Sequence, residues 1–338
     1  NLKNVTMLPQ FSAICGITEQ EVKTVFADGI EKMATEYGCT AEEMFDRLKK
    51  RYDGYHFSEK SEDIYNPYSL LNVFTDCRLA NYWFDSGTPT FLIRQMQHFH
   101  TDIMSLDRME VFASEFDQPT EAMSTALPLL YQSGYLTIKG YDRETETYIL
   151  AIPNQEVRID YTEGLLPVYT GLEAGRVKAG FAVKFWQALR RGDADQAMRE
   201  MQAYLSLTPS PSPIGEGSIY HQARKTAEKV TTPLPNRGGA GGEAEKFYEY
   251  TMYLIFSTLN FYVLTQVHCS GGRVDMVVWM PEAIYVFEFK VGGTAQEALQ
   301  QIDSHDYAIP YQTDGRPVVK VGVRFDGEKR VPVDWIVS

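Results

Sequence analysis

Apolar and polar residues alternate with a helical period through the first part of the chain. In residues 1–75, Thr18 with Glu21 and Thr40 with Glu43 have the spacing of a capping box, in which two side chains satisfy backbone N–H groups at a helix start. Apolar residues follow each pair at intervals of three and four positions. The pattern therefore predicts a subdomain of short helices, and we assign it no catalytic role.

The period changes near the middle of the chain. A helical pattern ends at Ser133 and Gly134, and two alternating runs, 135–139 and 147–151, follow it. This order predicts a helix followed by a β-hairpin, which resembles a winged-helix unit. The hairpin loop holds three acidic residues beside one arginine, so we expect the unit to pack within the protein rather than to recognise DNA.

Residues 208–242 differ in kind from their neighbours. They are rich in Pro, Gly, Ser and Thr and poor in large apolar residues, so folding would bury too little surface to offset the lost chain entropy. We interpret this segment as a low-complexity linker or an insertion. It separates a helical connecting region, residues 156–207, from a C-terminal domain, residues 243–338.

The C-terminal domain has the pattern of a mixed α/β fold. An amphipathic helix comes first, three strand-like runs follow it, and a second helix leads to a further strand. The three runs are 262–268, 273–280 and 284–291, the second helix spans about 294–307, and the last strand is 318–325. The short connections are typical of a single domain of roughly a hundred residues.

Alternation along the third strand decides which of its polar side chains share a face. Glu288 and Lys290 lie two positions apart and therefore project to the same side. The four-residue connection 280–283 permits an antiparallel hairpin with the preceding strand. In such a hairpin Asp275 can lie near Glu288, so we expect the three side chains to form one site.

These residue types suit metal-assisted chemistry on a phosphate ester. Carboxylate oxygens hold Mg²⁺ while leaving positions for water and phosphate. The ion would activate a water, and a lysine would orient that water or stabilise developing negative charge. The alternative is a structural ion pair on a solvated sheet face, and Glu288 and Lys290 taken alone favour it.

Composition limits the other classes of function. The chain has 338 residues, enough for two or three cores, and its formal charge of −13 disfavours loose binding to a polyanion. Four scattered cysteines favour neither a zinc site nor a disulfide framework. Neither a long apolar run nor a signal-peptide pattern is present, so we expect a soluble, cytoplasmic protein without a membrane partner.

The C-terminal domain resembles the PD-(D/E)XK nuclease-like, or restriction-endonuclease-like, domain of a family of large bacterial proteins that also carry an AAA-ATPase-like region. The matching stretches are GRVDMV at 272–277, YVFEFK at 285–290, ALQQI at 298–302 with Tyr307, and VGVRF at 321–325. As a combination they are quite specific. Each stretch alone is a weak signal.

The resemblance implies roles for individual residues. Asp275 and Glu288 would bind the metal ion, Lys290 would be catalytic, and Gln301 on the following helix would support them. Glu245 would be the carboxylate that the superfamily places on its first helix. Two other residues on or just before that helix, Glu243 and Glu249, remain alternatives.

The upstream part resembles the same family at 52–55, 65–70, 133–137 and 152–158. Residues 1–155 would then be the remnant of an AAA-ATPase-like region. The chain has no GxxxxGK[ST] loop to bind nucleotide phosphates, and in the family that loop lies upstream of the point that matches Asn1. We therefore expect a fragment of a longer protein without ATPase activity of its own.

The sequence thus predicts a nuclease that uses Mg²⁺ or Mn²⁺ and hydrolyses phosphodiester bonds, with DNA as the expected substrate. The alternative function is a catalytically inactive nuclease fold that serves as an interaction or regulatory module. The acidic charge and the segment before residue 243 motivate that alternative. A homo-oligomer is a further open question.

Overall fold

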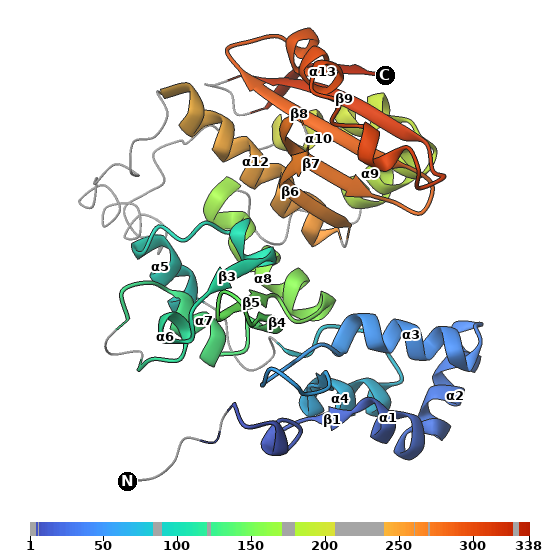
Figure 1. Cartoon of the computed structure of the whole chain (residues 1–338). Coiled ribbons are helices and arrows are strands. Elements are labelled where there is room, and N and C mark those ends of the chain that lie inside the picture. Colours follow the sequence, from blue (N-terminus) through green and yellow to red (C-terminus); the bar gives the residue numbers. More distant parts are fainter. Residues whose placement is uncertain are drawn as a thin grey trace, which may run out of the picture. The chain divides into compact units, whose positions relative to one another are not determined.

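The computed structural model describes residues 5, 7–83, 90–119, 123–170, 180–206, 240–259, 261–269, 271–326 and 331–338. The chain divides into two compact units, Asn1–Leu165 and Leu166–Ser338 (Figure 1). Both units combine helices with β-sheet, which confirms the expected mixed α/β class. The predicted linker 208–242 lies almost wholly outside the described residues, and the predicted domain boundaries stay a prediction.

The first unit begins with the expected short helices. They are preceded by η1 (Pro9–Phe11) and are α1 (Glu19–Val25), α2 (Ala27–Tyr37), α3 (Ala41–Tyr52) and α4 (Pro67–Asp76). Both predicted capping boxes are present, at Thr18 with Glu21 and at Thr40 with Glu43. A two-stranded ribbon, β1 (Ile17–Thr18) with β2 (Ile64–Tyr65), closes this part. Its core consists of fully buried apolar residues that include Met33, Met44, Leu48, Tyr52 and Tyr65.

The second part of this unit contains the predicted helix and hairpin. The helix is α7 (Leu127–Gln132), and β4 (Thr137–Asp142) pairs antiparallel with β5 (Thr147–Ala151). A strand that we did not predict, β3 (Met109–Val111), pairs with the other edge of β5. The remaining elements are α5 (Thr90–His98), η3 (Ser105–Asp107), α6 (Ala113–Phe116) and α8 (Gln155–Thr170), whose residues after Leu165 are counted with the second unit.

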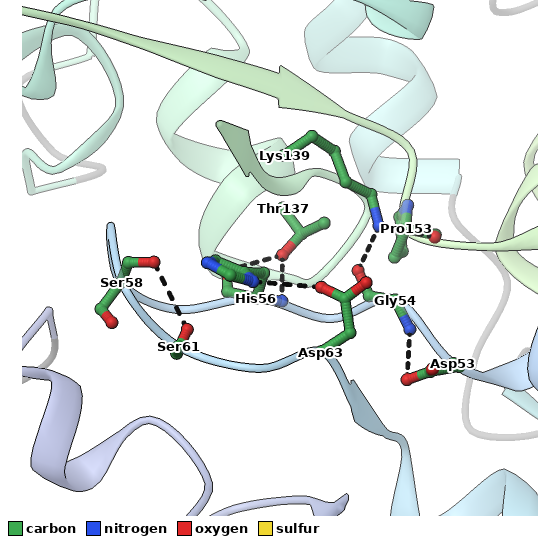
Figure 2. Close-up of polar contacts among 9 residues, drawn as sticks. All are labelled: Asp53, Gly54, His56, Ser58, Ser61, Asp63, Thr137, Lys139 and Pro153. Atoms are coloured by element: carbon green, nitrogen blue, oxygen red, sulfur yellow. Dashed lines mark hydrogen bonds and ion pairs between the residues drawn. The ribbon is translucent and has the colours of Figure 1, made fainter. Parts of the chain in front are cut away.

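Hydrogen bonds connect the segment that follows α3 to the hairpin of β4 and β5 (Figure 2). The N–H of His56 donates to Thr137 Oγ1 at 2.8 Å, and the same hydroxyl donates to the His56 carbonyl at 2.8 Å. Lys139 Nζ donates to the carbonyl oxygens of Gly54 and Pro153. Because these bonds satisfy backbone groups that would otherwise lose contact with water, they join the two parts of the unit.

The second unit is built on a five-stranded sheet in the order β10-β9-β8-β7-β6 (Figure 1). Its strands are β6 (Tyr262–Cys269), β7 (Gly272–Trp279), β8 (Ile284–Val291), β9 (Val318–Phe325) and β10 (Pro332–Val337). The first four are predicted, and β10 is an addition. All neighbours pair antiparallel except β8 and β9, which are parallel and are connected through α13 (Ala295–Ser304) and η5 (Ile309–Tyr311).

One face of the sheet is covered by α13. Gly322 of β9 makes this approach possible, because a Cβ atom there would lie 2.5 Å from the Ala295 carbonyl oxygen and from the Leu299 amide nitrogen. Val286 of β8 and Ile302 of α13 are fully buried in the same apolar cluster. Since a Cβ atom at Gly322 would point toward α13, the side chains of its register partners on neighbouring strands face α13 too.

Helices from upstream in the chain cover the other face. They are α9 (Gly180–Arg190), α10 (Ala194–Ser206) and α12 (Ala240–Thr258). The ring of Phe287 packs against Phe256 of α12 at 5.5 Å between centroids, and the Tyr285 hydroxyl donates to the Leu189 carbonyl of α9. Helices on both faces explain why β8 is an almost continuous apolar run. Within the described residues, no helix has the length and apolar character to span a membrane.

Candidate active site

Strands β7 and β8 bring Asp275 and Glu288 together. The antiparallel register pairs Met276 with Phe287, and its continuation sets Asp275 opposite Glu288. The Phe289 N–H donates to Asp275 Oδ2 at 2.8 Å, and the Asp275 N–H lies 3.5 Å from Glu288 Oε2. Each carboxylate therefore approaches the backbone of the opposite strand just where the regular pairing of β7 with β8 ends.

Lys290 completes the expected group on the same face. Its Nζ atom lies 3.6 Å from Glu288 Oε1, which is an ion pair but is longer than an ordinary hydrogen bond. The Lys290 side chain keeps 25% of its surface exposed, whereas that of Glu288 keeps 2%. Solvent or a substrate can therefore reach the Lys290 side chain, whereas Glu288 is almost fully covered.

The charge balance of the site favours a cation. Burial and then the negative charge of Asp275 raise the pKa of Glu288, Lys290 opposes both effects, and the net result is a pKa of about 8. Two ionised carboxylates beside one lysine carry a net charge of −1. A divalent cation would relieve the repulsion between Asp275 and Glu288 and would hold both in the ionised form.

The donor set fits a hard divalent ion of the Mg²⁺ type. Mg²⁺ is usually held by one or two carboxylates together with water and substrate phosphate, rather than by a closed set of protein ligands. Among the residues that the structure describes, no group of three or more His, Cys, Asp or Glu side chains converges as a metal site. Asp275 and Glu288 would therefore hold such an ion as a pair.

The carboxylate expected on the first helix of the C-terminal domain was assigned to Glu245, with Glu243 and Glu249 as alternatives. Glu245 lies in α12, but its side chain is outside the described residues, so its role stays a prediction. Glu249, one turn further along α12, is 8% exposed, and its Oε2 accepts a hydrogen bond from Gln266 Nε2 at 2.5 Å. The register of β6 with β7 sets Gln266 opposite Asp275. Glu249 therefore reaches the strand position beside the site.

Gln266 is a residue that sequence reasoning missed. Its backbone is left-handed (φ 53°) in the middle of β6, which is uncommon for a residue other than glycine. An ionised Glu249 can only accept, so the amide nitrogen of Gln266 faces it and Oε1 points elsewhere. That oxygen is buried and has no hydrogen-bond partner among the described residues. No periodic pattern predicts such a conformation.

Gln301 lies on α13 as expected, and it is half-buried. Within the described part of the chain, no hydrogen bond connects its side chain to Asp275, Glu288 or Lys290. Its carbonyl oxygen accepts the N–H of His305 at 3.1 Å. The supporting role that we assigned to Gln301 therefore stays a prediction.

A second candidate site is the polar cluster of His56, Asp63, Ser58 and Ser61 in the first unit, but its geometry does not suit catalysis. His56 Nδ1 lies 3.0 Å from Asp63 Oδ1, which resembles the base and orienting carboxylate of a hydrolase (Figure 2). The nearest hydroxyl in sequence, Ser58, is fully buried, and the described residues provide its Oγ with no hydrogen bond. Ser61 donates to the Ser58 carbonyl. These contacts position a loop and do not activate a nucleophile.

The raised pKa of Glu288 predicts how pH changes stability. The folded protein binds a proton at Glu288 between its ordinary pKa near 4.5 and about 8, whereas the unfolded chain releases it. Stability in the absence of metal should therefore fall as pH rises through this window, by at most about 1.4 kcal/mol per unit. Glu288→Gln removes this dependence and should be more stable than the parent at pH 8.

Urea unfolding from pH 5 to pH 8 in EDTA would measure this effect. Three of the four tryptophans belong to the second unit, so their fluorescence reports mainly on it. Asp334→Asn on β10 is the matched control, because Asp334 is exposed and its loss should leave the pH slope unchanged. Equal slopes for the parent and Glu288→Gln would contradict the prediction.

Comparisons with known proteins agree with this geometry. Residues 243–335 match the family model of the PD-(D/E)XK nuclease superfamily. The whole chain aligns with an uncharacterised protein from the vnfD 5′ region of Azotobacter chroococcum mcd 1, at 28% identity over 350 residues. The chain spans 59% of the length of that relative. No solved structure shows a significant match. The C-terminal sheet is thus a nuclease-superfamily fold, and the AAA-ATPase-like origin of residues 1–155 stays a prediction.

Proposed function

We propose that the second unit hydrolyses phosphodiester bonds of nucleic acid, with DNA as the substrate and Mg²⁺ or Mn²⁺ as the cofactor. The observation that carries this proposal is the convergence of Asp275, Glu288 and Lys290 at the end of the β7–β8 pairing. A structural ion pair of Glu288 with Lys290 would not require the half-buried carboxylate of Asp275 beside it, whose repulsion with the buried Glu288 costs stability unless a cation compensates it. Nucleases of the matched superfamily generally use divalent metals, which supports the same conclusion.

Each residue has a role that its position allows. Asp275 and Glu288 would hold the ion, which when bound polarises a phosphoryl oxygen and lowers the pKa of a coordinated water. Lys290 presents its ammonium beside Glu288, where it can donate to a phosphoryl oxygen as negative charge develops. Glu249 and Gln266 would position the Asp275 side of the site.

The direct test is cleavage by the purified full chain. Plasmid DNA, linear DNA and a structured RNA are incubated with Mg²⁺, with Mn²⁺ and with EDTA. We expect both DNA substrates to be cut with either ion and to stay intact in EDTA. DNA that remains intact with both ions would contradict the proposal and favour the inactive module. If the RNA is degraded preferentially, RNA rather than DNA is the substrate.

A further inference from the structure

Arg324 lies directly beside Lys290 in the sheet. The parallel register of β8 and β9 pairs Lys290 with Arg324 and Glu288 with Gly322. Neighbouring strands are about 4.8 Å apart, and register partners project to the same side. The face is the one toward α13, because Lys320, on the same row of β9, forms an ion pair with Asp303 of α13 at 2.7 Å. Two cationic side chains thus stand next to each other at the candidate site.

Arg324 forms no ion pair and no side-chain hydrogen bond within the described part of the chain. Its register partner on β10, the exposed Asp334, carries an opposite charge on the same face, but no ion pair joins the two side chains. Lys320, four residues earlier on the same face of β9, forms an ion pair with Asp303. Like charges on adjacent strands destabilise a sheet. An anion bound between Lys290 and Arg324 would remove that cost.

The position of the pair in the sheet is compatible with ligand binding. Both residues lie at the carboxyl ends of parallel strands, where α/β sheets commonly bind ligands. Gly292, which follows β8, has φ 83°, and a Cβ atom there would meet nothing within 4 Å. At the N-terminus of α13 the capping box uses the N–H groups of Thr294 and Glu297, and the Glu297 carboxylate lies there. That carboxylate disfavours an anion at the helix end, so the cationic side chains are the better partners for one.

We propose that Arg324 binds a phosphate of the substrate strand adjacent to the reacting phosphate. This inference rests on the proposed function and adds the path of the substrate, which would cross the carboxyl ends of β8 and β9. The guanidinium group can donate two parallel hydrogen bonds to one phosphate, which fixes position as well as charge. Arg324 is therefore a positioning residue, and Lys290 is the group beside the reacting atoms.

The test measures binding apart from cleavage. The full chain and its Arg324→Ala variant are titrated onto labelled DNA in Ca²⁺, by fluorescence anisotropy at 50–200 mM salt, a range over which phosphate contacts weaken steeply. We expect the variant to bind about tenfold more weakly and the slope of log K against log salt to fall by about one. In cleavage assays its KM should rise while kcat stays near that of the parent.

Two further variants control for the loss of charge and for effects on folding. Lys320→Ala removes a positive charge from the same strand and face, but that charge is already paired, so its salt slope should match the parent. Arg324→Gln should repeat the result of Arg324→Ala if alanine disturbs folding. An unchanged affinity and salt slope in a folded Arg324 variant would overturn this inference even if the parent cleaves DNA. A parent that binds DNA but never cleaves it would instead overturn the proposed function.

Discussion

Replacing Lys290 with methionine should lower the rate of phosphodiester cleavage by about 10²- to 10⁴-fold, as the loss of a group that stabilises transition-state charge does. Methionine keeps most of the apolar stem of the side chain and removes only the ammonium group. That group lies 3.6 Å from Glu288 Oε1, on a side chain that is 25% exposed. The loss should appear in kcat under saturating Mg²⁺.

The same change should also shift the pH at which metal binds. Lys290 lowers the pKa of Glu288, so its removal raises that pKa further and keeps Glu288 protonated to a higher pH. Calorimetry should therefore find weaker Mg²⁺ binding at pH 7 and recovery near pH 9. Lys320→Met on β9 serves as the control, and we expect it to cleave like the parent. A Lys290→Met variant that cleaves at the parental rate would exclude catalysis by Lys290.

Replacing Asp275 with asparagine should abolish both metal binding and cleavage. The loss should exceed the 10- to 100-fold that removal of an outer-shell partner typically costs, because Asp275 is one of the two carboxylates available to the ion. The fold should survive, since an asparagine oxygen can still accept the Phe289 N–H. Titration calorimetry with Mg²⁺ and Mn²⁺ measures the affinity.

A control variant and an expected change in the pKa of Glu288 test this prediction further. Asp334→Asn removes an equal charge from β10 and should leave Mg²⁺ affinity unchanged. In Asp275→Asn the pKa of Glu288 should fall, because the negative charge that raises it is gone. Divalent-ion binding with equal affinity in the parent and in Asp275→Asn would place the ion elsewhere. The absence of any binding in the parent would support the inactive interaction module.

The site was predictable where it depends on strand periodicity. Alternation along 284–291 placed Glu288 and Lys290 on one face, and a connection of four residues was enough to predict the antiparallel hairpin that brings Asp275 to them. Both signals are local in sequence. They do not depend on how the rest of the chain folds.

The missed features depend on contacts between distant segments. The pairing of Lys290 with Arg324 requires the parallel register of β8 and β9, which α13 and the loop after it determine. The hydrogen bond from the Tyr285 hydroxyl to the Leu189 carbonyl joins segments 96 residues apart. The left-handed backbone of Gln266 breaks local preference, so only tertiary contacts can stabilise it. The strand β10 was missed because its six residues follow a short polar segment.

The ending of the β7–β8 pairing at Asp275 has a consequence for hydrogen exchange. In a regular ladder, backbone amide protons are protected by carbonyl oxygens, which hold no proton at any ordinary pH. Here the Phe289 amide is protected by the Asp275 carboxylate, whose negative charge a bound cation would share. The exchange rate of that single amide therefore becomes a reporter of the charge state of the site, even though the amide belongs to the backbone of the core strand.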